Sequence, residues 1–241
     1  TGYMTSLPSL KAPFVFSCFN HTIFDMQVLT HELGHAFAGY MAMRSQPISD
    51  YYSETTDIAE IHSMSMEQFA YPYAQWFFGD QADKFRFAHL QEALTFVPFG
   101  VAVDEFQHIC YADPQLTPKE RTYQWRLLEE KYMPWRRYDN DAFMERGGYW
   151  YHKLHIYLYP FYYINYTLTT MGAMEFKNKY AEDKAAAWQD YLKLCKTGGS
   201  RSYLVTLRYA NLANPCEAGS VARACGYAED ILLRQLAGQE K

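Results

Sequence analysis

The residues best suited to chemistry are His31 and His35, with Glu32 directly after the first histidine. Residues four positions apart in an α-helix lie on one face about one turn apart, so both imidazole rings could reach a single zinc ion. Glu32 would stand beside that ion, where a carboxylate can accept a proton from an attacking water molecule. This pattern predicts a zinc-dependent hydrolase, although five residues alone can also match by chance.

A catalytic zinc site needs three protein ligands and an open position, so the third ligand must come from another segment. We predict Glu60, because the helix that carries it follows the histidine helix and could pack against it as an antiparallel partner. Ser63 and Glu67 share the helical face of Glu60 and could hydrogen-bond to a zinc ligand. On spacing alone, several other acidic residues could serve as the third ligand.

The elements that must position these side chains are mostly helices. Thr22 and Asp25 resemble a capping box ahead of the first helical period. A β-branched and aromatic run predicts one short strand over residues 11–19, with Pro13 marking an edge. Pro160 should kink or break the helix that contains it. The predicted helices are residues 23–44, 53–71, 81–111, 117–133, 141–180, 184–195 and 217–236. The predicted fold class is therefore all-α, mainly helical, with a small β element.

Length and composition limit the possible functions. The 241 residues can form one large domain or two small ones, and the helical pattern favours a single domain over residues 1–241. A net charge of −5 without a run of Lys and Arg argues against nucleic acid as a partner. No apolar stretch is long enough to predict a membrane span, so no membrane partner is expected. Five widely spaced cysteines without a C-x-x-C pair favour reduced thiols and a cytoplasmic location.

Three blocks of sequence together resemble one protein family. They are the pentad at residues 31–35, the acidic segment at residues 60–67, and a segment rich in His and Tyr at residues 155–166. In this order and spacing they resemble oligoendopeptidase F and the Pz-peptidases, which belong to the thimet oligopeptidase family of zinc metallopeptidases. The resemblance implies a zincin-like catalytic helical domain with one zinc ion per chain. It also implies that His31, His35 and Glu60 bind the zinc and that Glu32 is the general base.

The segment rich in His and Tyr has an implied role of its own. In the family it supplies groups that bind the substrate and stabilise the oxyanion that forms during hydrolysis. The resemblance assigns this role to His155 and to one or more of Tyr162, Tyr163 and Tyr166. A three-residue step keeps Tyr163 and Tyr166 on one helical face, so spacing separates them poorly, and Tyr166 is the preferred oxyanion donor.

The predicted function is that of a zinc-dependent endopeptidase. It would hydrolyse internal peptide bonds of short oligopeptides with a water molecule that zinc and Glu32 activate together. Two alternatives stay open: a zinc-containing helical module that binds peptides without cutting them, and a related metallocarboxypeptidase. The presence of Glu32 argues against the first alternative, and no arginine stands out as an anchor for a terminal carboxylate in the second.

Members of the resembled family are normally longer, with a large helical region ahead of the zinc motif. Because the motif begins at residue 31 here, we expect the chain to be the C-terminal part of a longer family member. The N-terminal helical region of that protein would then be a partner of this chain. We also expect an exposed apolar surface where that region would pack.

Overall fold

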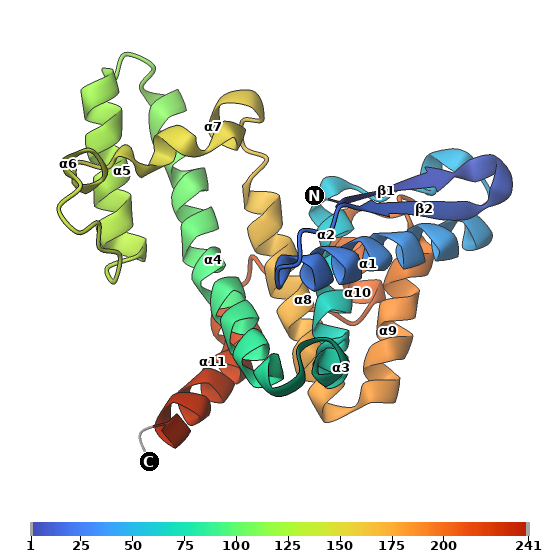
Figure 1. Ribbon diagram of the computed structural model, residues 1–241. Coiled ribbons are helices and arrows are strands. Elements are labelled where there is room, and N and C mark those ends of the chain that lie inside the picture. The colour runs from blue at the N-terminus through green and yellow to red at the C-terminus, as the bar shows by residue number, and fades with distance from the viewer. Residues whose placement is uncertain (1, 240–241) are drawn as a thin grey trace. The chain divides into compact units, whose positions relative to one another are not determined.

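The computed structural model describes residues 2–239 and is built almost entirely of helices (Figure 1). The chain folds as two compact units. The first combines the described residues of Thr1–Gln91 with those of Leu168–Lys241, and the second is Glu92–Thr167. The chain leaves the first unit within α4 (Ala82–Ala112) and returns to it within α8 (Ile164–Glu182). The predicted class, all-α with a small β element, is confirmed.

A two-stranded hairpin forms the β element of the first unit (Figure 1). Strand β1 (Gly2–Leu7) pairs antiparallel with β2 (Ala12–Ser17), and the register runs from Gly2 opposite Ser17 to Leu7 opposite Ala12. Pro13 is tolerated because both strands of such a sheet are edges. Only β2 was predicted from the sequence, because β1 contains glycine and serine, which have low strand propensity.

Helices make up the rest of the first unit. Besides its parts of α4 and α8, it contains α1 (Phe24–Ser45), α2 (Thr56–Phe69), α3 (Ala74–Phe78), α9 (Lys184–Thr197), α10 (Tyr203–Tyr209) and α11 (Ser220–Gln239). The predicted helices at residues 23–44, 53–71, 184–195 and 217–236 are confirmed within a few residues at each end. The short helices α3 and α10 were not predicted, because a helix of 5 or 7 residues is too short to show a helical period in the sequence.

Helix α1 begins after a turn that the Asp25 carboxylate holds together. This carboxylate accepts hydrogen bonds from the backbone N–H groups of Asn20, His21 and Thr22, at 2.9, 2.6 and 3.2 Å. The Thr22 hydroxyl instead donates to the Asn20 side chain at 2.7 Å, so only the acidic half of the expected capping box forms. A negative charge at this end of α1 is also favoured by the helix dipole.

Helices α1 and α2 touch backbone to backbone at Gly34. A Cβ atom added to Gly34 would lie 2.5 Å from the Cα atom of Ser63 and 2.7 Å from the carbonyl oxygen of His62. Neither backbone atom can rotate away as a side chain can, so the space admits no side chain at all. Glycine at this position lets the face of α2 that carries Glu60 lie directly against α1.

Apolar side chains behind α2 form the core of the first unit. Ile61, Phe69, Phe176, Tyr191 and Leu194 are buried there and come from α2, α8 and α9. The rings of Phe69 and Tyr191 meet edge to face with centroids 5.1 Å apart, a favoured aromatic geometry. This core fixes α2 on the side away from its polar face, and that polar face is thereby held toward α1.

The second unit is built around the C-terminal part of α4. Its other elements are α5 (Pro118–Tyr132), α6 (Ala142–Glu145), the 3-10 turn Gly148–His152, α7 (Leu154–Leu158) and the start of α8. Phe106 and Trp125 pack edge to face in its core with centroids 5.3 Å apart. Helix α5 matches the prediction at residues 117–133 and begins with a complete capping box between Thr117 and Glu120.

The predicted helix at residues 141–180 is wrong over its first half, where the chain forms α6, a 3-10 turn and α7 instead. Gly147 has a φ angle of +98°, and a Cβ atom there would lie 2.2 Å from the carbonyl oxygen of Thr122 on α5. The chain therefore turns at Gly147 and packs onto α5 rather than continuing a helix. The break expected at Pro160 is confirmed, since Phe161 after it has a φ angle of +58°.

Three neighbouring aromatic residues around α3 are exposed: Tyr73, Trp76 and Phe77. The Trp76 side chain is the most open of them, at 79% of its accessible surface. The sequence predicts an exposed apolar surface where an N-terminal helical region would pack. That such a region covers these three side chains stays a prediction. Among the described residues, no helix is both long enough and apolar enough to cross a membrane.

We expect Gly34→Ala to lower the free energy of unfolding by about 2 kcal/mol, because the new methyl group must push α1 and α2 apart. Gly39→Ala on the same helix is the matched control. A Cβ atom at Gly39 meets only the side-chain atoms Ser6 Oγ at 3.2 Å and Met4 Cε at 3.6 Å, which can move. Because alanine has a higher helix propensity than glycine, Gly39→Ala should leave the free energy of unfolding unchanged or raise it by up to about 1 kcal/mol. Urea unfolding of both variants measures the difference, and equal effects would contradict the steric argument.

We expect Asp190→Asn to lower the free energy of unfolding by about 2 kcal/mol at pH 7. Asp190 on α9 accepts hydrogen bonds from Lys179 at 2.6 Å, Lys193 at 2.7 Å and Asn211 at 2.8 Å. Burial opposes ionisation of Asp190, but these bonds outweigh it and hold the pKa below the ordinary value.

Because the folded pKa of Asp190 lies below the unfolded one, its contribution is complete above the unfolded pKa, about 3.9, and disappears as the pH falls through the folded value. The stability difference between wild type and Asp190→Asn should therefore shrink below about pH 4. Urea unfolding at a series of pH values measures it, with the exposed Asp230→Asn on α11 as control. A difference that stays constant down to pH 3 would exclude the ionised form of Asp190 as its source.

Candidate metal centre

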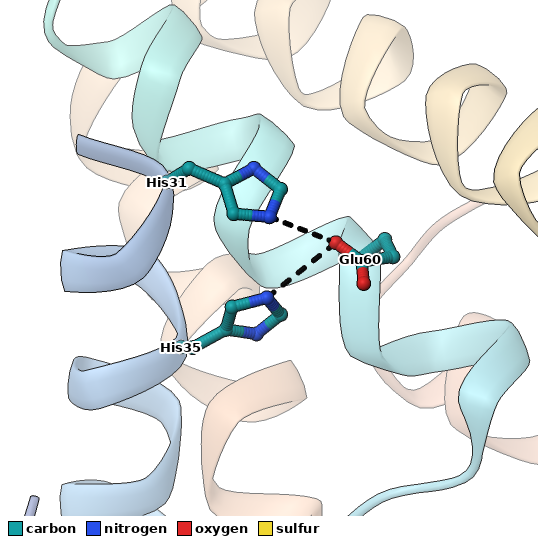
Figure 2. Close-up of side chains that lie close together, drawn as sticks. All are labelled: His31, His35 and Glu60. Atoms are coloured by element: carbon teal, nitrogen blue, oxygen red, sulfur yellow. Dashed lines mark ion pairs between the residues drawn. The ribbon is translucent and has the colours of Figure 1, made fainter. Parts of the chain in front are cut away.

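Helices α1 and α2 bring His31, His35 and Glu60 together (Figure 2). The Nε2 atoms of His31 and His35 lie 3.0 Å and 3.4 Å from Oε2 of Glu60. One possible ligand atom from each residue falls within 4.8 Å of the others. Across residues 2–239, no other set of three His, Cys, Asp or Glu side chains meets this spacing.

The three donor atoms suit a zinc ion in chemistry and in spacing. Zinc binds imidazole nitrogen and carboxylate oxygen at about 2.0–2.2 Å, so two donors on a tetrahedral ion stand about 3.3 Å apart. The separations of 3.0 Å and 3.4 Å to Glu60 are close to that value. Two imidazoles and one carboxylate also form a ligand set that catalytic zinc sites use with one position left open. The residues present therefore fit zinc.

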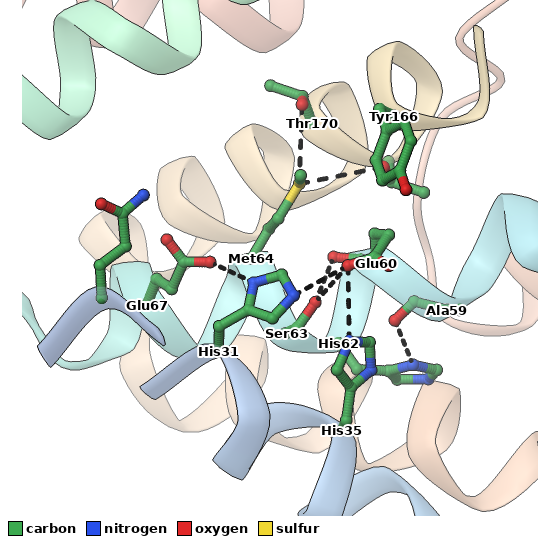
Figure 3. Close-up of polar contacts among 12 residues, drawn as sticks. His31, His35, Ala59, Glu60, His62, Ser63, Met64, Glu67, Tyr166 and Thr170 are labelled. Atoms are coloured by element: carbon green, nitrogen blue, oxygen red, sulfur yellow. Dashed lines mark hydrogen bonds and ion pairs between the residues drawn. The ribbon is translucent and has the colours of Figure 1, made fainter. Parts of the chain in front are cut away.

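Two polar side chains of α2 hold the candidate ligands in place (Figure 3). The Ser63 hydroxyl donates a hydrogen bond to Oε2 of Glu60 at 3.0 Å. Nδ1 of His31 donates to Oε1 of Glu67 at 2.6 Å, so Nε2 is the nitrogen that faces Glu60. Both contacts were foreseen from the shared helical face of Glu60, Ser63 and Glu67. Such contacts fix the orientation of a ligand and the tautomer of a histidine.

The carboxylates around His31 make this site favourable for positive charge. Burial alone would lower the pKa of His31, but its hydrogen bonds with Glu60 and Glu67 raise the pKa to about 10. Burial also opposes ionisation of Glu60, while hydrogen bonds with His31 and His35 hold its pKa well below the ordinary value. A bound cation would gain from the same negative surroundings.

Glu67 is shared between two histidines. Its Oε2 atom lies 2.6 Å from Nε2 of His89, and Nδ1 of His89 lies 2.7 Å from the Tyr71 hydroxyl. Glu67, His89 and Tyr71 are all buried. Neither His89 nor Tyr71 was predicted from the sequence. His89 lies on α4 and Tyr71 on the 3-10 turn Tyr71–Tyr73, and the three side chains meet only because these elements pack beside α2.

Glu32 lies on α1 directly after His31 and is covered by β1. The residue is 9% exposed, and a Cβ atom at Gly2 would lie 3.2 Å from Cγ of Glu32. The backbone of β1 therefore passes close over the Glu32 side chain and excludes solvent on that side. A carboxylate in such surroundings interacts more strongly with nearby charges and protons than one in water.

His62 is close in sequence to Glu60 but does not belong to the three-residue group. It is 1% exposed, and its Nδ1 atom lies 3.1 Å from Oε1 of Glu54. Its backbone carbonyl accepts a hydrogen bond from the buried Tyr191 hydroxyl at 3.0 Å. These contacts give His62 a packing role behind the candidate site.

His155 and three tyrosines form an aromatic cluster in the second unit. The His155 ring centroid lies 5.1 Å from that of Tyr163 and 6.0 Å from that of Tyr166. The hydroxyl of Tyr162 donates to that of Tyr166 at 3.2 Å. Burial lowers the pKa of His155, and the positive charge of Lys153 lowers it further, so the ring is neutral at pH 7.

Tyr163 differs from the other two tyrosines. It is buried in the core of the second unit, and Nζ of Lys153 donates to its hydroxyl at 3.1 Å. Burial raises the pKa of Tyr163 to about 12. Its hydroxyl is therefore engaged inside the unit, whereas Tyr166 is only half-buried at the edge of the same cluster.

Known proteins resemble this chain over most of its length. The family model described as "Peptidase family M3" matches residues 2–224. A protein named oligoendopeptidase F homolog, from Borreliella burgdorferi, is 25% identical over 198 residues, which cover 78% of this chain and 32% of that protein.

Solved structures give closer matches. A structure of Pz peptidase A with an inhibitor has a TM-score of 0.88 and 46% identity, covering 97% of this chain and 42% of that one. An X-ray structure that carries the name oligoendopeptidase F has a TM-score of 0.87 and 49% identity, covering 96% and 41%. The chain thus spans about a third of the curated relative and about two fifths of these solved chains. Because the family model covers nearly all of the chain, this chain belongs to peptidase family M3.

Proposed function

We propose that the chain carries the active site of a zinc-dependent endopeptidase that hydrolyses internal bonds of short oligopeptides, with one zinc ion per chain. The main support is the convergence of Nε2 of His31, Nε2 of His35 and Oε2 of Glu60, at the separations that zinc donors require. Membership of peptidase family M3 supports peptide hydrolysis as the reaction. The names of the matched relatives support oligopeptides as the substrates.

In this proposal His31, His35 and Glu60 are the zinc ligands. Ser63 holds the Glu60 carboxylate by donating to Oε2, and Glu67 holds His31 by accepting from Nδ1. When bound, zinc would polarise the peptide carbonyl as a Lewis acid and lower the pKa of a coordinated water toward about 7. The three ligands leave a fourth position open for that water and the substrate.

Glu32 is the proposed general base. Its carboxylate accepts a proton from the attacking water and passes it to the departing amine, so one side chain serves both halves of the reaction. Its place on α1 directly after His31 supports this role, because the backbone of a regular helix fixes the two residues relative to each other. Cover from β1 restricts competing solvent around the carboxylate.

His155 and Tyr166 are the proposed donors to the oxyanion. The carbonyl oxygen becomes negative as water adds, and an O–H or N–H group aimed at it stabilises that charge. Tyr166 suits the role better than Tyr163, because Tyr163 is buried in the core of the second unit and Tyr166 is only half-buried. A neutral His155 keeps one N–H for donation.

We expect Glu32→Gln to abolish peptide cleavage while zinc binding is retained, because glutamine keeps the shape but cannot accept the proton. The loss of kcat should be about a thousandfold or more. Cleavage of an internally quenched peptide and metal analysis of both proteins measure the two quantities. The exposed Glu229→Gln on α11 controls for the substitution itself.

Comparable cleavage by wild type and Glu32→Gln would remove Glu32 as the base. Zinc in both proteins with no cleavage by the wild type would favour a peptide-binding module over an enzyme.

We expect Tyr166→Phe to lower kcat by about a hundredfold at unchanged zinc content, because the oxyanion loses one donor. Tyr163→Phe should lower kcat less, since the Tyr163 side chain is buried in the core of the second unit. Steady-state kinetics of the two variants with one quenched peptide make the comparison. A larger loss in Tyr163→Phe would transfer the donor role to that residue.

A further inference from the structure

A continuous series of hydrogen bonds leads away from the metal centre through buried side chains. It runs from Nδ1 of His31 to Glu67 at 2.6 Å, from Glu67 to Nε2 of His89 at 2.6 Å, and from Nδ1 of His89 to the Tyr71 hydroxyl at 2.7 Å. Every atom in it belongs to the first unit of the fold. Glu67, His89 and Tyr71 are 7%, 7% and 8% exposed, so water cannot easily replace any of these bonds.

The direction of each bond follows from the Tyr71 end. Tyr71 shares a hydrogen bond with the Gln68 side chain. Because Oε1 of Gln68 accepts no hydrogen bond in the described part of the chain, the Gln68 amide is the donor in this contact and the Tyr71 oxygen is the acceptor. The Tyr71 proton is therefore available to Nδ1 of His89, and burial raises the pKa of Tyr71 well above its ordinary value. With Nδ1 acting as acceptor, the ring proton of a neutral His89 must be on Nε2, where it is donated to Glu67.

The series of hydrogen bonds continues from Glu67 to the candidate ligand His31. Oε2 of Glu67 accepts from His89, and Oε1 accepts from Nδ1 of His31. When a metal takes the place of the proton between Nε2 of His31 and Glu60, the proton that stays on Nδ1 leaves the lone pair of Nε2 for that metal. Each donor meets one acceptor from Tyr71 to His31, and reversing any one bond would leave two protons or two lone pairs facing each other.

The outer end of the series is itself held in place. Nζ of Lys177 lies 4.7 Å from the centroid of the Tyr71 ring, and the rings of Tyr71 and His89 meet edge to face at 5.6 Å. The His89 ring also stacks on Phe85 with centroids 5.6 Å apart. Neither ring can turn freely, so the nitrogen atoms of His89 keep their directions.

We propose that His89, held by Tyr71, is a positioning residue for the metal centre: it fixes Glu67 so that His31 presents Nε2 to the metal. This inference rests on the proposed function, because it assumes that His31 binds zinc. Among the described residues, no other donor reaches Oε2 of Glu67, so loss of His89 would free the carboxylate to rotate. That rotation would loosen His31 without touching a ligand.

The first experiment compares two substitutions of the same residue. His89→Met fills a similar volume without a donor, while His89→Gln keeps an N–H at the end of the chain that can reach Glu67. Zinc affinity is measured by competition with a chelator, and the free energy of unfolding is measured on the metal-free proteins. His89→Met should weaken zinc binding about 10-fold to 100-fold, and His89→Gln should bind zinc close to wild type.

Tyr71→Phe provides a second test that keeps the ring and removes only the donor. It should weaken zinc binding in the same direction as His89→Met and by a smaller factor. Tyr203→Phe is its matched control, because the Tyr203 hydroxyl is buried in the same unit without a hydrogen-bond partner among the described residues. Tyr203→Phe should leave the zinc affinity unchanged.

A purely structural role predicts another pattern. The metal-free variants would then lose stability, but zinc affinity of the folded His89→Met and Tyr71→Phe proteins would equal that of wild type, and this result would overturn the inference. Absence of zinc binding by the wild type would instead overturn the proposed function. If His89→Met does not fold, Tyr71→Phe still separates the two roles by its zinc affinity.

The proton positions are tested directly by ¹⁵N NMR of the imidazole nitrogens in the zinc-loaded protein. His89 should be neutral with its proton on Nε2, and His31 should carry its proton on Nδ1. In Tyr71→Phe, the Nδ1 signal of His89 should lose the shift caused by a donated hydrogen bond. A His89 ring with its proton on Nδ1, or with protons on both nitrogens, would contradict the proposed direction of the series.

Discussion

The backbone contact between α1 and α2 at Gly34 is the constraint on which the candidate metal centre depends. Two histidines on one helix define only one side of a site, and the acid that completes it must come from a helix that lies unusually near. A side chain at Gly34 would meet the backbone of Ser63 and His62 and push that helix away. Separations of 3.0 Å and 3.4 Å from Glu60 to the two imidazoles exist because nothing stands between the helices there. The glycine inside the histidine motif is thus as much a part of the site as its ligands.

The helical framework around this contact could be read from the sequence, and the hairpin could be read only in part. Long amphipathic stretches predict helices well, and α1, α2, α5 and α9 follow their predicted ranges closely. The prediction failed where local signals were weak or where tertiary packing overrode them. The region after residue 141 has a helical composition, but Gly147 turns the chain onto α5 and forces separate short elements. Strand β1 has little intrinsic preference and owes its form to pairing with β2.

Within the candidate site, the sequence predicts which side chains come together when they share one helix. It does not predict contacts between residues of different helices. His31 with His35, and Glu60 with Ser63 and Glu67, follow from helical spacing within α1 and α2. Glu60 could be chosen over other acids only by its resemblance to a family pattern, because spacing alone does not fix how two helices meet. His89 and Tyr71 had no signal at all, since their contacts arise from a later helix and a 3-10 turn that pack over α2.

Glu60 and Glu67 lie on one face of α2, and their hydrogen bonds decide which of them can serve a metal. Each oxygen of Glu67 already accepts a hydrogen bond from a histidine, so coordination of a metal by this carboxylate would compete with those bonds. A second available carboxylate beside Glu60 would favour hard cations such as calcium, which bind through several oxygen atoms. With Glu67 occupied, the pocket offers two nitrogens and one carboxylate, a set that suits zinc. The shared carboxylate thereby ties the choice of metal to the fold, because His89, which engages one of its oxygens, comes from α4, a helix that carries none of the candidate ligands.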